Sequence, residues 1–148
     1  MTDSQNTRQF VGFQVDGQSY AFPIEKVQEI VILDDATKTP QVARCVEGVS
    51  NLRGSIIPII NLRKLLELPT KPTDAETRTI VVNVGERTVG CTVDAVSQVI
   101  RIAEDTIQPV PEALSADGNR DIAGFAKQND QLVILLDVEQ LLSPDRFQ

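Results

Sequence analysis

The sequence predicts a mostly β protein made of two small closed or half-closed barrels, with only short helical turns. Of the 148 residues, 41% are hydrophobic and 24% are charged, a balance that suits one compact domain or two small subdomains. Apolar residues alternate with polar ones in short runs that end at turn residues, which is typical of β-strands. Parallel βα folds require long crossover helices, and the sequence contains no pattern long enough for one.

The chain also aligns with itself in two ungapped blocks. Residues 10–31 match residues 79–100 at an offset of 69, and residues 48–66 match residues 124–142 at an offset of 76. In both blocks aliphatic residues face aliphatic residues. Two blocks in the same order indicate a tandem duplication in which the second copy has gained seven residues between them.

The duplication sets the predicted boundaries. Repeat units of about 10–66 and 79–142, joined by a linker over 67–78, make up one predicted domain of residues 9–143. We expect residues 1–8 to be a flexible N-terminal segment and residues 144–148 to be a C-terminal tail.

Each unit is expected to begin with a β-hairpin. Alternating apolar residues flank turn residues at 16–17 in the first unit and at 85–86 in the second. Apolar residues after Pro23 then fit a single helical turn that leads into a strand, and the same pattern recurs from Val93.

Each unit is expected to close with a strand and a short helix. The β-rich runs 56–60 and 132–136 are each followed by a two-turn apolar pattern that ends in two leucines. Asn61 and Asp137 stand where the period changes from strand to helix, and both residue types are favoured N-caps.

Composition and charge exclude several classes of function. The net charge of −7 disfavours binding to nucleic acid, and the absence of His removes the commonest general base and zinc ligand. Cys45 and Cys91 lie in apolar runs without metal-binding spacing, so we expect two buried thiols in a reducing compartment and no metal site. The longest apolar runs fall far short of the roughly 20 residues of a membrane span, which predicts a cytosolic protein without direct membrane insertion.

Candidate catalytic groups are few. Asp34 and Asp35 follow an apolar run, as the acids of a phosphorylatable receiver domain do, but the βα alternation of a receiver is missing. Glu25, Asp94 and Asp137 stand at expected helix starts, so capping explains them without a substrate. No nucleophile motif or phosphate-binding glycine loop occurs. We therefore expect a protein that is not an enzyme and that uses no cofactor.

The clearest difference between the two units lies in a turn. Residues 51–54 of the first unit align with residues 127–130 of the second, so Arg53 places a fork-shaped guanidinium cation at the tip of the first unit only. A guanidinium can bind a carboxylate through two parallel hydrogen bonds. The carboxylate could belong to a partner or to this chain, and the sequence leaves both open.

Residues 48–63 resemble the signature of the CheW-like domain, the coupling module of bacterial chemotaxis arrays. Residues 20–30, 89–99 and 122–137 fall in the family's order and spacing, so the resemblance covers about residues 9–143. Four motifs in register identify the chain as a member of this family. The resemblance implies two intertwined, SH3-like five-stranded β-barrels, in agreement with the duplication.

The resemblance also implies a non-catalytic adaptor that joins the cytoplasmic tips of chemoreceptors to the regulatory domain of a CheA-type histidine kinase. The positions that match the family's receptor-binding surface, in the groove between the barrels, are Val27, Glu29, Gly48 and Arg53. Kinase contacts in the family use the barrel ends, and the motifs do not place them on individual residues. Receptors would recruit this cytoplasmic protein to membrane-associated arrays.

Two alternatives remain open. Within the family, the protein could serve a chemosensory system that controls pili, development or second-messenger output. Outside the family, a small β-barrel enzyme or ligand-binding barrel would need a saturable small-molecule site, which no motif suggests.

The sequence departs from the family pattern at Asn61, where most members have Asp. Asn caps a helix about as well as Asp, so we expect the fold to tolerate the change. An ion pair from that position to Arg53 or Arg63 would be lost. No receiver or kinase segment accompanies the domain, so the resemblance implies a stand-alone coupler.

Overall fold

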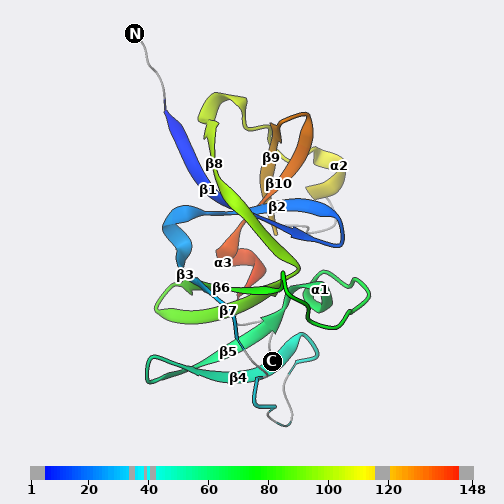
Figure 1. Cartoon of the computed structure of the whole chain (residues 1–148). Coiled ribbons are helices and arrows are strands. Elements are labelled where there is room, and N and C mark those ends of the chain that lie inside the picture. Colours follow the sequence, from blue (N-terminus) through cyan, green and yellow to red (C-terminus); the bar gives the residue numbers. More distant parts are fainter. Residues whose placement is uncertain (1–5, 34–35, 39, 41–42, 116–120, 144–148) are drawn as a thin grey trace.

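The chain forms two five-stranded β-sheets, each curved into a small barrel, stacked one above the other (Figure 1). The computed structural model describes residues 6–33, 36–38, 40, 43–115 and 121–143. The first barrel has the strand order β8-β1-β2-β10-β9, and the second has the order β3-β6-β7-β5-β4. The two orders are equivalent under the sequence repeat, so both barrels have the same architecture.

The strands of the first barrel are β1 (Thr7–Val15), β2 (Gln18–Pro23), β8 (Ala95–Ala103), β9 (Ile122–Gln128) and β10 (Gln131–Leu136). Those of the second are β3 (Val27–Val31), β4 (Val46–Leu52), β5 (Ser55–Asn61), β6 (Arg78–Val84) and β7 (Arg87–Val93). The helical segments are η1 (Ile24–Lys26), α1 (Leu62–Leu65), η2 (Glu104–Thr106), α2 (Glu112–Ser115) and α3 (Val138–Leu141).

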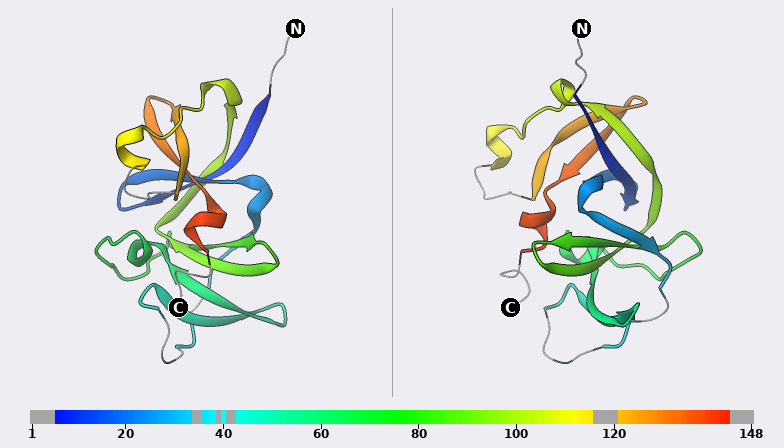
Figure 2. Two further views of the ribbon diagram at one scale, coloured as in Figure 1. Left: turned by 180° about the vertical axis from the view of Figure 1, so that it is seen from behind. Right: turned by 90° about the vertical axis from the view of Figure 1, so that its left-hand side faces the viewer.

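The two sequence units are intertwined, so neither barrel is made from one unit alone. The hairpin β1–β2 of the first unit pairs with β8 and β10 of the second unit, and β6–β7 of the second unit pairs with β3 and β5 of the first. The chain therefore crosses from one barrel to the other at η1 and again after β7, as the views in Figure 2 show. This arrangement confirms the expected fold class.

The largest hydrophobic core lies between the barrels rather than inside either of them. Phe13 and Phe22 from the first barrel pack there with ring centroids 4.7 Å apart, against Ile80, Val82 and other residues of the second. Two smaller clusters lie in the barrel interiors, one around Phe10 in the first barrel and one around Ile57, Ile59 and Val81 in the second. Burial between the barrels makes the two halves depend on each other for stability.

The predicted hairpin turns and helix caps are largely confirmed. Asp16 and Gly17 both have positive φ, as the two central residues of a type I′ hairpin turn require. Asn61 accepts hydrogen bonds from the amides of Arg63 and Lys64, and Asp137 accepts one from Gln140. Asn61 thus caps α1, as expected despite its departure from the family pattern.

Two local predictions are wrong. The second unit has no helical turn at Val93, because β8 begins at Ala95 directly after a bend. Glu25 and Asp94 do not cap helices: Glu25 lies 3.8 Å from Arg8, and the Asp94 carboxylate accepts hydrogen bonds from the side chain of Arg63 and the amide of Asp16. Glu25 lies inside η1 and no helix follows Asp94, so neither side chain has a helix end to cap, and both carboxylates face an arginine from another segment.

Both cysteines are buried, as predicted. Burial raises the pKa of the Cys91 thiol to about 12, so this thiol stays protonated and unreactive at neutral pH. Within the described residues, no three His, Cys, Asp or Glu side chains gather as a metal site would require. In the same part of the chain, no helix has the length and apolar character of a membrane span.

Candidate functional site

The expected binding residues Glu29 and Arg53 meet across the two edges of the second barrel. Glu29 lies on the edge strand β3, and Arg53 lies at the tip of the β4–β5 hairpin. Arg53 donates two hydrogen bonds to the Glu29 carboxylate, from Nε at 3.1 Å and from Nη2 at 2.7 Å. The carboxylate partner that the sequence left open is therefore within this chain.

The ion pair presents the Arg53 cation to solvent. The Glu29 side chain is only 19% exposed, whereas the Arg53 side chain is 74% exposed. The hydrogen bonds from Arg53 hold the pKa of Glu29 below its ordinary value, and those to Glu29 raise the pKa of Arg53, so both groups stay charged. Glu29 thus positions a guanidinium whose remaining N–H groups face solvent.

Arg53 occupies an unusual backbone position for a long side chain. Its φ of 52° and the φ of 88° at Gly54 give a type I′ turn, in which Asn is preferred at the first central position. The equivalent residue in the first barrel is Asn129, with the same φ of 52°. A residue held in the left-handed region against its preference suggests a function for its side chain.

Val27 and Gly48 contribute shape rather than charge. Val27 is half-buried at the start of β3 and packs against the core between the barrels. Gly48 is buried in β4 with a φ of 147°, and a Cβ there would overlap the carbonyl oxygen of Thr37. The Thr37 backbone in turn exchanges two hydrogen bonds of 2.8 Å with Val49. Gly48 therefore lets the segment before β4 lie against that strand.

Gly48→Ala is expected to lower the free energy of unfolding by about 2 kcal/mol, because the new Cβ displaces Thr37 and the backbone is strained for any L residue. Chemical denaturation measures the change. Gly54→Asn is the matched control, since Gly54 also has positive φ but a Cβ added there would meet no atom within 4 Å. Equal destabilisation by both variants would contradict the role given to Thr37.

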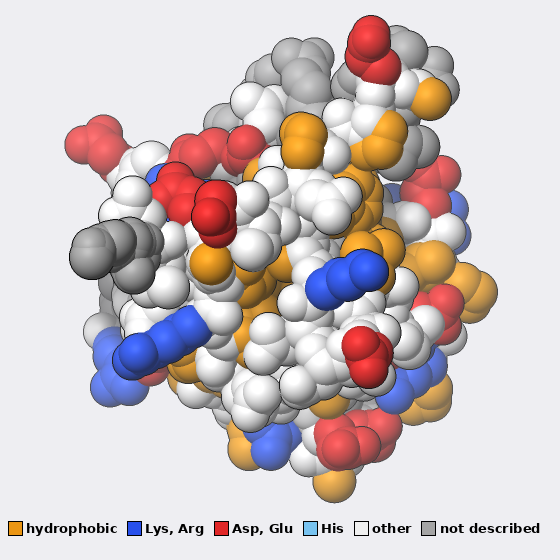
Figure 3. Space-filling view, turned by 90° about the horizontal axis from the view of Figure 1, so that it is seen from above, with side chains coloured by type: hydrophobic (Ala, Val, Ile, Leu, Met, Phe, Trp, Pro, Cys, Tyr) orange, Lys and Arg blue, Asp and Glu red, His pale blue; other side chains and the backbone are white. Residues whose placement is uncertain are grey.

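The first barrel carries an uncharged copy of the same arrangement. Gln98 and Asn129 replace Glu29 and Arg53, whereas Val96 and Gly124 replace Val27 and Gly48 with similar chemistry. A Cβ at Gly124 would lie 2.9 Å from the carbonyl oxygen of Gln108, whereas one at Gly48 would overlap that of Thr37. Figure 3 shows the face formed by the first barrel, with hydrophobic side chains and white surface near the centre, a Lys or Arg side chain close to it and most acidic side chains towards the rim. The charged pair therefore distinguishes the two barrels.

Sequence reasoning missed a second ion pair, which lies where the chain crosses between the barrels. Arg63 in α1 donates to the Asp94 carboxylate at 2.9 and 2.7 Å, and its Nη1 donates to the carbonyl oxygen of Pro69 in the linker at 2.7 Å. The same carboxylate accepts the amide of Asp16 from the first barrel at 2.8 Å. The sequence repeat gave no sign of this contact, because the residue of the second unit that is equivalent to Arg63 is Glu139.

Two other expectations are not decided by these contacts. Asp34 and Asp35, the acids considered as phosphoryl acceptors, lie outside the described residues. The kinase contacts were not predicted for particular residues. The exposed hydrophobic residues Ile30 and Ile56 flank the Glu29–Arg53 pair in sequence, at 40% and 65% exposure.

Two intertwined barrels with an exposed, fixed charge at one barrel edge define a small β-barrel interaction domain. The sequence profile of the CheW-like domain matches residues 9–146. The chain belongs to the CheW-like domain family. Its relatives are chemotaxis proteins, so the chain is an adaptor protein of chemotaxis.

These relatives agree over nearly the whole chain. The chain is 39% identical to the chemotaxis protein CheW of Helicobacter pylori, over 97% of this chain and 86% of the relative. It is 36% identical to CheW of Klebsiella aerogenes, over 95% of this chain and 84% of the relative. The crystal structure of the scaffolding protein TtCheW from Thermoanaerobacter tengcongensis matches with a TM-score of 0.85 and 32% identity, covering 94% of each chain.

Proposed function

We propose that the protein bridges the cytoplasmic tips of chemoreceptors and the regulatory domain of a CheA-type histidine kinase, without catalysing a reaction itself. Its receptor surface comprises Val27, Glu29, Gly48 and Arg53. The protein acts in the cytoplasm and reaches the membrane-associated receptor array through its partners. The observation that carries this proposal is the exposed Arg53 guanidinium, fixed by Glu29 at the edge of the second barrel.

The geometry of the pair supports recognition of a protein partner. A guanidinium already oriented by two hydrogen bonds loses little side-chain freedom on binding, so its contact with a partner's carboxylate or carbonyl costs less entropy. Arg53 is also the kind of residue that is enriched among energetically important interface residues. Its charge selects partners and steers their approach, because like charges are repelled.

The neighbouring hydrophobic residues supply the apolar part of such an interface. Ile30 on β3 and Ile56 on β5 are 40% and 65% exposed, and Val27 at the start of β3 is half-buried. Burial of exposed aliphatic side chains contributes about 25 cal/mol per Å² of apolar surface. A helical receptor tip with apolar residues and an acidic or carbonyl acceptor fits this surface.

The double variant Glu29→Gln/Arg53→Asn tests the proposal, because it gives the second barrel the uncharged pair that the first barrel carries at equivalent positions. Asn suits the left-handed turn, so the fold is retained. We expect binding to a receptor cytoplasmic fragment, measured by isothermal titration calorimetry, to weaken at least about tenfold, a typical loss when a charged interface contact is removed.

Asn129→Arg is the matched control, since it places a guanidinium at the equivalent turn of the first barrel. This variant is expected to bind the receptor fragment as the unmodified protein does. Unchanged affinity of the Glu29→Gln/Arg53→Asn variant, with both proteins folded, would remove the pair from the receptor surface.

A further inference from the structure

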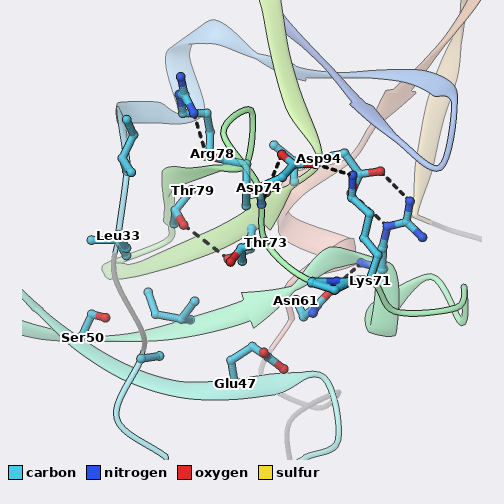
Figure 4. A pocket seen from close by; sticks show the side chains of 18 residues that line it. Leu33, Glu47, Ser50, Asn61, Lys71, Thr73, Asp74, Arg78, Thr79 and Asp94 are labelled. Carbon is cyan, nitrogen blue, oxygen red and sulfur yellow. Dashed lines mark hydrogen bonds and ion pairs between the residues drawn. The ribbon is translucent and has the colours of Figure 1, made fainter.

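A cavity of about 340 Å³ opens at one end of the second barrel, beneath the linker between the two sequence units (Figure 4). Linker residues 71–74 and 77–78 line one side of it, and residues of β4, β5, β6 and β7 line the other. This volume lies in the range of small-molecule sites in proteins. The Glu29–Arg53 pair is not among its lining residues, so the cavity is separate from the proposed receptor surface.

The two barrels differ at an interior position that borders the cavity. In the first barrel this position is Phe10, which is 1% exposed and fills the interior against Ile100 and Ile102. The repeat places Thr79 there in the second barrel, with Thr92 opposite it on β7 as Pro23 is opposite Phe10. Replacing a phenyl ring by a threonine side chain leaves space that the smaller side chains do not fill.

The replacement also gives the cavity a polar floor. Thr79 is 3% exposed, and it is the buried polar residue among the described parts of the chain. Its Oγ1 lies 3.3 Å from Oγ1 of Thr92, a long hydrogen bond in which a single proton is shared. Each hydroxyl can both donate and accept, so the pair retains hydrogen-bonding capacity towards a group in the cavity.

Much of the remaining lining is aliphatic or held in ion pairs. Leu33, Ala36 and Ile59 supply apolar wall. Three ion pairs hold most of the charged lining residues: Arg63 with Asp94 at 2.7 Å, Lys71 with Asp74 at 3.1 Å, and Glu47 with Lys64 at 2.7 Å. The remaining charged lining residue, Arg78, donates from Nη1 to the carbonyl oxygens of Ala75 and Thr77, both at 2.9 Å. In Figure 4 the dashed lines join Lys71 and Asp74 beside the opening. A charged ligand would be desolvated without gaining a free counter-charge from the three pairs, and Arg78 is already hydrogen-bonded to backbone carbonyl groups.

We propose that this cavity binds a small uncharged molecule that has vicinal hydroxyl groups at one end and a short aliphatic chain. The hydroxyl groups hydrogen-bond with Thr79 and Thr92, and the aliphatic chain packs against Ile59 and Leu33. Because linker residues form one wall, the bound molecule orders the linker between the two sequence units. The site gives the adaptor a small-molecule input that is independent of its protein partners.

Titration of the full-length protein with hexane-1,2-diol, followed by ¹H–¹⁵N correlation spectra, tests this proposal. We expect saturable shifts confined to residues around Thr79, Thr92 and the linker. Hexanoate and hexylammonium have a similar chain with a charged head, and each should bind at least about tenfold more weakly. Shifts that do not saturate, or that spread over the surface, would refute a defined site.

Two variants locate the binding. Thr79→Phe restores the residue found at the equivalent position of the first barrel, fills the cavity and should abolish the saturable shifts. Thr79→Val keeps the volume and removes one hydroxyl, so it should weaken diol binding by about fivefold, the effect of one hydrogen bond. Diol binding that is unchanged in Thr79→Val overturns the proposal even if Thr79→Phe does not fold. Receptor affinity is not the readout, so this result is independent of the adaptor function.

Discussion

Phe22→Ala is expected to lower the free energy of unfolding by about 4 kcal/mol, the typical cost of deleting a buried phenyl ring. Phe22 is fully buried on β2, and its ring lies 4.7 Å from that of Phe13 in the core between the barrels. Each barrel contains strands from both sequence units. Loss of this packing should therefore unfold both barrels in one cooperative transition, rather than the first barrel alone.

Hydrogen exchange of amides in β1 and β7, measured together with chemical denaturation, separates these outcomes. The control is Ile32→Ala, because Ile32 is 71% exposed and its truncation should change stability by less than about 0.5 kcal/mol. If protection in β1 falls while that in β7 is retained, the two barrels unfold independently, and the core between them does not couple the halves.

Arg63→Ala is expected to lower the free energy of unfolding by about 2 kcal/mol, in the range found for hydrogen bonds to charged groups. The side chains of Arg63 and Asp94 are 13% and 16% exposed, so solvent screens their attraction only in part. Without Arg63, the Asp94 carboxylate still accepts the hydrogen bond from the amide of Asp16, but it loses its counter-charge at the junction of the barrels. Thermal or chemical denaturation measures the loss.

A second ion pair provides the control for this comparison. Lys26 and Glu139 meet at the other crossover, where η1 leads into β3, with Nζ and Oε2 2.8 Å apart. Their side chains are 37% and 44% exposed, so Glu139→Gln should cost no more than about 0.5 kcal/mol. If Arg63→Ala and Glu139→Gln lower the free energy of unfolding equally, the burial and bidentate geometry of Arg63 contribute no additional stability.

The Asp94 pair also predicts a dependence of stability on pH. Hydrogen bonds from Arg63, and from the amide of Asp16, hold the pKa of Asp94 below its ordinary value in the folded state. The unfolded state then binds protons more readily, so this contribution is fully present above about pH 4 and is lost as pH falls through the lower, folded pKa. Denaturation between neutral and acidic pH should show a smaller acid-induced loss for Asp94→Asn than for the unmodified protein. If Asp94→Asn and the unmodified protein lose the same stability on acidification, Asp94 does not contribute to that loss.

Local sequence signals were sufficient for the hairpins, the closing strands and two of the caps. Asp16 and Gly17 specify their turn through backbone preference alone, and Asn61 caps α1 with its own side chain. Such features depend on a few neighbouring residues, so the sequence states them directly. The repeat then gave the equivalence of the two halves.

Features that depend on distant residues could not be read in the same way. Nothing in the local pattern around Asp94 distinguishes a helix cap from the partner of Arg63, 31 positions earlier. The exchange of strands between the barrels became predictable through the family resemblance and not through periodicity. The cavity borders Thr79, which stands where the repeat has Phe10. The sequence shows this difference, but only the structure shows that both side chains point into a barrel.

The sequence supplied the residues that we propose for the receptor surface, but it did not predict the contact between two of them. The asymmetry of the repeat singled out Arg53, and the family resemblance added Val27, Glu29 and Gly48. That Glu29 binds Arg53 follows from barrel closure, which brings the edge strand β3 to the tip of the β4–β5 hairpin. A pair of residues 24 positions apart carries no local signal of such a contact.

The central claim is that this protein holds a receptor and a kinase together, and a three-component pull-down tests it most directly. An immobilised receptor cytoplasmic fragment is incubated with the regulatory domain of the CheA-type kinase, with and without the purified protein. We predict that the kinase domain is retained only when the protein is present, and that the Glu29→Gln/Arg53→Asn variant abolishes this retention while remaining folded. Retention of the kinase domain to the same extent without the protein, or its absence from the beads with the protein present, would contradict the bridging function.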